Sequence, residues 1–159
     1  MSRLLLVRHA HAGDRGAWVG DDALRPLSAR GSAQATALAA LLAPLAADPA
    51  AAVVSSPALR CTATVAPLAA RLGTDVRVES TLGEGADAGA LLDRVAGLAA
   101  PTVWSSHGDV IPALLLLLAA RGVDLGVDPT CRKASTWVLE LADGRVTAAR
   151  HLPPPDVSG

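Results

Sequence analysis

Four basic side chains in this sequence each stand at or shortly after the end of a short apolar run: Arg8, His9, Arg60 and His107. A guanidinium group stays protonated and pairs well with phosphate oxygens, and a neutral imidazole can act as a nucleophile. Attack on a phosphoryl group needs cations around its oxygens and a nucleophile in line with the leaving group. Brought together, these four side chains would suit that chemistry.

The apolar runs that precede these residues have the pattern of strands in a parallel sheet. Leu4–Val7 is an uninterrupted aliphatic run, typical of a strand that is buried on both faces. Runs 51–55 and 102–105 are similar, and each is followed by small polar residues and then by a helical pattern. Ligands of open parallel sheets bind at the carboxyl ends of the strands, so we expect the four side chains to meet in one crevice.

The remaining pattern completes an α/β fold, which we expect to be a three-layer sandwich. Its central sheet is mainly parallel, is flanked by helices and carries a C-terminal antiparallel hairpin around Asp143-Gly144. The domain covers residues 1–152, and 153–159 is a flexible tail. The loop 11–27 covers the mouth of the crevice. The other expected elements are helices over 28–46, 57–72, 90–99 and 111–121, an edge strand over 75–79, and hairpin strands over 136–141 and 146–151.

Composition limits the function classes. Of the 159 residues 51% are hydrophobic, which excludes a disordered chain. The formal net charge of −1, with no basic run, gives no attraction to nucleic acid or to anionic membranes. Cys61 and Cys131 fit neither a zinc pattern nor a disulfide scaffold, so we expect reduced thiols. We find no signal peptide, and the apolar run 114–120 is too short to span a membrane, so we expect a cytoplasmic protein.

Three motifs, taken together, resemble those of the histidine phosphatase superfamily, also called phosphoglycerate mutase-like. They are R-H-A after the first strand, S-S-P-x-x-R-C-x-x-T after the second and S-H-G-D near position 107, and the resemblance extends from about Leu4 to Leu152. Segments 20–27 and 132–139 resemble a narrower branch. That branch contains the phosphatase-like domain that follows a Nudix domain in some two-domain nucleotide hydrolases and, more distantly, small bacterial protein phosphohistidine phosphatases.

The resemblance implies a metal-independent phosphatase without a cofactor, acting on a small phosphorylated metabolite or nucleotide. His9 would carry a phosphohistidine intermediate, while Arg8, Arg60 and a protonated His107 would hold the phosphate. Glu84 lies on the loop where related enzymes carry a general acid, and we weigh that role equally against a solvated glutamate.

Other residues are candidates for the outer part of the site. A second phosphate or a nucleotide tail could contact Arg25, Arg132 and Lys133, although exposed basic residues are usually only solvated. Ser56 could donate a hydrogen bond to phosphate or serve in the turn before Pro57. Trp18 is either a stacking lid or a residue that packs its own loop. We expect structural or exposed roles for the two remaining histidines, His11 and His151.

Three alternatives stay open. A protein phosphohistidine phosphatase would need no general acid, and a catalytically silent module would keep the pocket for recognition only. The third is a metal site built from His9-Ala10-His11 with Asp14 and His107, which Arg8 and Arg60 disfavour by repelling a cation. The expected partner is the phosphorylated substrate, small molecule or phosphohistidine protein, and a separate Nudix partner is left open. The sequence does not determine the physiological substrate or the oligomeric state.

Overall fold

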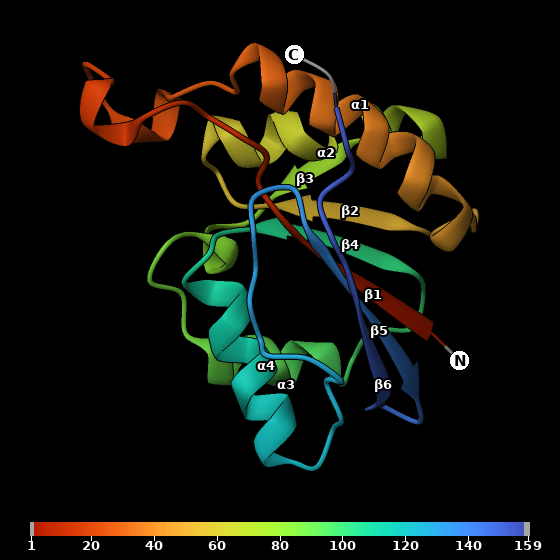
Figure 1. The fold of residues 1–159 in the computed structure, drawn as a ribbon. Coiled ribbons are helices and arrows are strands. Elements are labelled where there is room, and N and C mark those ends of the chain that lie inside the picture. Colours follow the sequence, from red (N-terminus) through yellow and green to blue (C-terminus); the bar gives the residue numbers. More distant parts are fainter. Residues whose placement is uncertain (1, 158–159) are drawn as a thin grey trace.

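Strand β1, Ser2–Arg8, lies inside a six-stranded sheet in the computed structural model, which describes residues 2–157 (Figure 1). β1 pairs in parallel with β4, Thr102–Ser106, and antiparallel with β5, Thr136–Ala142. The side chains of Leu4, Leu5, Leu6 and Val7 are at most 2% exposed. The aliphatic run is therefore covered on both faces, as its sequence predicts.

The sheet has the order β3-β2-β4-β1-β5-β6. β2, Ala52–Ser55, pairs in parallel with β4 and with the short edge strand β3, Val76–Val78. β6, Arg145–Leu152, pairs antiparallel with β5 across a turn in which Asp143 and Gly144 have positive φ angles of 52° and 74°. The expected mainly parallel sheet with a C-terminal antiparallel hairpin is thus confirmed.

Four helices form the two outer layers (Figure 1). α1, Ala29–Leu42, and α2, Leu59–Leu72, pack on Leu5 and Val7 of β1. α3, Ala88–Val95, and α4, Val110–Ala120, pack on Leu4 and Leu6. Alternate residues of one strand thus enter two cores, which is the pleat period of a β-strand.

Several boundaries differ from those expected. The first helix ends at Leu42 and not near Ala46, because Pro44 lies in a following 3-10 turn, Ala43–Leu45. α3 begins two residues early, at Ala88, because the side chain of Asp87 accepts hydrogen bonds from the Gly89 and Ala90 amides. Residues 153–157 have no regular secondary structure, while the rest of the expected tail, 158–159, lies outside the described residues. Within 2–157 no helix has the length and apolarity to cross a bilayer.

The loop after β1 contains two short 3-10 turns that its irregular sequence does not predict, Arg15–Ala17 and Asp22–Leu24. The side chains of Asp14 and Asp21 cap them by accepting from the Gly16 and Ala23 amides. These turns give the loop a defined course near the carboxyl end of β1.

A close backbone approach at Gly31 joins this loop to helix α1. The His11 carbonyl accepts from the Ser28 amide at 3.0 Å, and Ser28 Oγ accepts from the Gly31 amide at 3.0 Å. A Cβ atom on Gly31 would lie 1.9 Å from the His11 carbonyl oxygen, which is backbone and has little freedom to move. The first turn of α1 therefore requires glycine at this position.

We predict that Gly31→Ala destabilises the protein by roughly 1–3 kcal/mol, the usual cost of overpacking. Urea unfolding followed by circular dichroism would measure the change in the free energy of unfolding. Gly97→Ala is the matched control, because a Cβ there would meet its nearest atom, the Arg94 carbonyl oxygen, at 3.6 Å. Equal unfolding midpoints for the two variants would contradict the prediction.

Candidate active site

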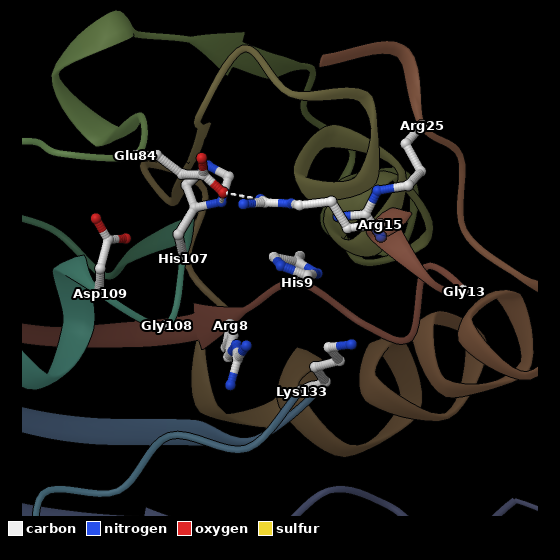
Figure 2. Close-up of a pocket in the computed structure, with 10 residues that line it drawn as sticks. All are labelled: Arg8, His9, Gly13, Arg15, Arg25, Glu84, His107, Gly108, Asp109 and Lys133. Carbon is white, nitrogen blue, oxygen red and sulfur yellow. Dashed lines mark hydrogen bonds and ion pairs between the residues drawn. The ribbon is translucent and has the colours of Figure 1, made fainter. Parts of the chain in front are cut away.

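The strand register brings the predicted residues to one edge of the sheet. Arg8 of β1 pairs with Ser106 of β4, and Ser55 of β2 pairs with Ser105 of β4. The next residues along the three strands therefore leave the sheet side by side. They open on a cavity of about 420 Å³ (Figure 2), lined by Arg8, His9, Gly13, Arg15, Arg25, Glu84, His107, Gly108, Asp109 and Lys133.

His9 lies in this cavity as a neutral imidazole with one free nitrogen. Its side chain is 5% exposed, and burial lowers its pKa to about 3. The Nδ1 atom lies 2.9 Å from the Ala10 carbonyl oxygen, so Nδ1 carries the proton and Nε2 keeps its lone pair. A neutral imidazole in this tautomer can accept a phosphoryl group on Nε2.

The threonine of the second motif helps to position His9. Thr64 lies one turn after Arg60 on α2, and its Oγ1 accepts a hydrogen bond from the Ala10 amide at 2.9 Å. The same Oγ1 donates to the Arg60 carbonyl at 2.6 Å. The hydroxyl thus links the backbone beside the proposed nucleophile to the helix that carries Arg60. We did not predict this role from the sequence.

Arg8 shares the cavity and packs against Gly108. Its NH1 group donates to the Cys131 carbonyl at 2.6 Å, and its buried Nε has no hydrogen-bond partner within the described residues. A Cβ on Gly108 would lie 2.6 Å from Arg8 Cζ. The glycine of the S-H-G-D motif therefore leaves the space that the guanidinium occupies.

His107 is buried and held by Ser56. Its Nε2 lies 2.8 Å from Ser56 Oγ, and its ring centroid lies 5.6 Å from that of His9. Burial and, second, the charge of Arg60 lower the pKa of His107, which favours a neutral ring over the protonated ring that the sequence led us to expect. Ser56 is buried and is not among the residues that line the cavity, and its described contact on this side is the one with His107.

Arg60 is 2% exposed and meets two carboxylates beside the cavity. Its NH2 lies 2.9 Å from Glu84 Oε1 and 3.1 Å from Asp22 Oδ2, and its NH1 donates to the Asp22 carbonyl at 2.8 Å. Asp22 also pairs with Arg25 at 2.9 Å and with Arg15 at 3.2 Å. The hydrogen bond from Arg25 is the main cause that lowers the pKa of Asp22.

Glu84 lines the cavity as the sequence predicts, in its ionised form. Partial burial opposes ionisation, but the hydrogen bond and charge of Arg15 lower the pKa of the Glu84 carboxyl overall. Its Oε1 lies 3.6 Å from His107 Nδ1 and also contacts Arg15 and Arg60. The carboxylate is therefore close to three of the cationic or imidazole groups of the site, Arg15, Arg60 and His107.

Comparison with known proteins identifies the family. The model of the histidine phosphatase superfamily (branch 1) matches residues 4–92. The chain belongs to this superfamily.

Relatives and solved structures agree with this membership. An 8-oxo-(d)GTP phosphatase of Mycolicibacterium smegmatis is 39% identical over 96% of this chain, and the match spans 48% of that protein, so the chain spans about half of its relative's length. The protein histidine phosphatase SixA in complex with tungstate has a TM-score of 0.79 at 20% identity, over 96% of this chain and 97% of that one. A mycobacterial glucosyl-3-phosphoglycerate phosphatase has a TM-score of 0.62 at 19% identity, over 95% of this chain and 96% of that one. At these identities the two solved structures show the shared histidine phosphatase fold.

The outer residues of this histidine phosphatase site differ in their placement. Arg25 and Lys133 line the cavity, as predicted, whereas Arg132 is exposed and does not. Lys133 makes no hydrogen bond or ion pair within residues 2–157, and burial followed by the charge of Arg8 lowers its pKa. Arg15, which we did not predict, lines the cavity and pairs with Glu84. Its loop has no periodic pattern that would have indicated this contact.

The two remaining histidines lie outside the cavity. His11 Nδ1 is 2.7 Å from Ser28 Oγ at the start of α1, and the ring of His151 packs beside Trp137 with centroids 5.1 Å apart. Within residues 2–157 no three His, Cys, Asp or Glu side chains are grouped as metal ligands. The structure therefore does not assemble the alternative metal site at His9-Ala10-His11.

We predict that Gly108→Ala lowers kcat/KM by at least tenfold while the unfolding midpoint stays nearly constant. The new methyl group would meet the end of the flexible Arg8 side chain, which can shift but would then leave its place in the cavity. Turnover of an aryl phosphate and urea unfolding would measure the two effects. Unchanged kcat/KM would mean that the position of the Arg8 guanidinium is unimportant.

Proposed function

We propose that this chain is a metal-independent phosphatase that hydrolyses a phosphoric monoester of a small metabolite or nucleotide through a phosphohistidine intermediate on His9. The neutral His9 imidazole, with Nδ1 bonded to the Ala10 carbonyl and Nε2 free, carries this proposal. Arg8 and His107 line the same cavity, and Arg60 lies beside it, paired with the cavity-lining Glu84. Membership of the histidine phosphatase superfamily supports the same chemistry.

The reaction proceeds in two transfers. In the first, His9 Nε2 forms a bond to phosphorus, the bond from phosphorus to the ester oxygen breaks, and that oxygen takes a proton from an acid. In the second, water attacks the phosphorus of the phosphohistidine and gives a proton to the carboxylate that the acid left behind, the bond from phosphorus to nitrogen breaks with its electron pair returning to His9 Nε2, and inorganic phosphate leaves. Arg8, Arg60 and His107 stabilise the charge on the phosphoryl oxygens in both transition states.

Glu84 is the proposed acid for the first transfer. Its ion pairs with Arg15 and Arg60 favour the ionised carboxylate. A phosphate dianion that takes the donors of Arg60 would remove one of these partners and place like charge beside the carboxylate, which favours its protonated form. Glu84 would then hold a proton next to the leaving oxygen.

A nucleotide substrate is favoured by the relative named 8-oxo-(d)GTP phosphatase. Since the chain spans about half of that relative's length, the activity in the relative's name need not reside in the matching half. A protein phosphohistidine phosphatase is the second candidate. The Glu84 side chain is 45% exposed, so the cavity is open to solvent at this residue. A phosphohistidine on the surface of another protein could enter there, which favours this second candidate.

We predict that reaction with ³²P-labelled substrate and rapid quenching traps acid-labile, base-stable label on the protein. His9→Ala should abolish the label and lower turnover by at least a thousandfold, because no other group supplies the nucleophile. His151→Ala is the matched control, since this histidine lies on β6 outside the cavity, and it should retain the label. Wild-type turnover by His9→Ala would refute the mechanism.

Glu84→Gln separates the substrate classes. If Glu84 protonates the leaving group, this variant should slow hydrolysis of alkyl phosphates by roughly 10²–10⁴-fold, the usual contribution of general acid catalysis. Aryl phosphates should slow less, and phosphoramidates such as phosphohistidine should change little, because their leaving nitrogen is basic enough to take a proton by itself. Steady-state kinetics on all three would measure this.

The control is Glu79→Gln, which removes a carboxylate paired with Arg94 outside the cavity and should leave all three rates unchanged. Equal slowing of the three substrates by Glu84→Gln would assign Glu84 to positioning of the loop. No slowing of any substrate would favour the phosphohistidine phosphatase candidate.

A further inference from the structure

A second cavity adjoins the phosphate site and is not used by the proposed mechanism. It has a volume of about 270 Å³ and lies along the loop after β1 and the start of α1. Its lining is mostly apolar and includes Ala17, Trp18, Pro26 and Leu27. Gly13 and Arg25 line both this cavity and the phosphate site, so the two spaces are neighbours.

Trp18 gives this second cavity an aromatic surface that is both exposed and fixed. Its side chain is 37% exposed, whereas the other two tryptophans, Trp104 and Trp137, are at most 1% exposed. The indole Nε1 donates to the Asp21 carbonyl at 3.0 Å, which restrains the ring. Burial of a restrained ring against a ligand loses little side-chain entropy, so such a ring suits binding of another flat group.

The same short turn carries an anion-binding residue and this aromatic residue. Arg15 begins the turn Arg15–Ala17 and lines the phosphate site, and the Trp18 amide that ends the turn donates to the Arg15 carbonyl at 3.3 Å. This turn and the residue that follows it therefore contribute to both cavities. A single ligand that contacts both would have a phosphate at one end and a flat apolar group at the other.

The junction between the cavities is open. Gly13 has a φ of +65°, and a Cβ atom built on it would meet no heavy atom within 4 Å. The Arg25 guanidinium, the other shared residue, is held by Asp22 Oδ1 at 2.9 Å and by the Ala12 carbonyl at 2.7 Å. Arg25 is 5% exposed, so these two contacts fix the wall that the cavities share.

From these observations we propose that the cavity at Trp18 binds the base of a nucleotide whose phosphate occupies the His9 site. This inference rests on the proposed function, and it selects nucleotides among the small phosphate esters. Stacking on Trp18 should raise the affinity for any ligand that carries a base. It should distinguish little between different bases, because every base has a flat π-face.

The test compares guanosine 5′-monophosphate with ribose 5-phosphate, which has the same reacting group and no base. Trp18→Ala should lower the ratio of kcat/KM for the nucleotide over the sugar phosphate by about 5- to 100-fold, the usual effect of losing one stacking partner. The change should lie mainly in KM. Trp18→Phe should restore most of the ratio. Val19→Ala is the matched control, because Val19 is 90% exposed and lines neither cavity.

A binding measurement separates this inference from the proposed function. The chain has three tryptophans and no tyrosine, so its emission comes from indole alone, and only Trp18 is exposed. Guanosine 5′-monophosphate should quench the emission of the His9→Ala variant, ribose 5-phosphate should not, and the quenching should disappear on adding Trp18→Phe. This result would support the base site even without turnover. An unchanged kcat/KM ratio in Trp18→Ala, or quenching that survives Trp18→Phe, would overturn the inference.

Discussion

The crowding of positive charge around one cavity is the constraint on which this site depends. Guanidinium and ammonium groups that share a partly buried space repel one another, and the lowered pKa of Lys133 reflects its burial and, second, that repulsion. Asp22 and Glu84 offset the repulsion by pairing with Arg60 from two different segments of the chain. The cationic side chains at or beside the cavity are Arg8, Arg15, Arg25, Arg60 and Lys133.

The sheet register, more than any single loop, brings these charges together. Parallel pairing of β2, β4 and β1 places three strand ends at one edge, and each end delivers a chemically active residue within one or a few positions. Ser56, His9 and His107 follow from this geometry, while Arg60 is added by the first turn of α2. A slip of the register by one residue would turn the side chains within a strand to the opposite face of the sheet and so displace the residues that follow its end.

Local sequence was sufficient to predict the position of the site residues that follow strands. It was insufficient for the residues that are held by contacts between distant segments of the chain. Arg8, His9 and His107 were predictable because an aliphatic run sets the strand end and the strand end sets their position. Asp22 and Arg15 were not, because an irregular loop gives no periodicity from which its contacts with Arg60 and Glu84 could be inferred. Arg132 and Lys133 are neighbours of the same type, and only the turn of the backbone decides that Lys133 lines the cavity.

The pairing pattern divides the cations into two groups, and this division bears on how a phosphate would enter. Within residues 2–157, Lys133 and the Nε atoms of Arg8 and Arg60 have no partners, whereas the NH2 of Arg60 is occupied by two carboxylates. A dianion gains most at donors that are already free, and it gains the NH2 donor of Arg60 only by displacing Glu84 and Asp22. Under the proposed mechanism, tighter holding of phosphate by Arg60 therefore releases the Glu84 carboxylate, which can take a proton from solvent and then give it to the leaving oxygen. The ion pairs of Glu84 would thus link substrate binding to the supply of the acid.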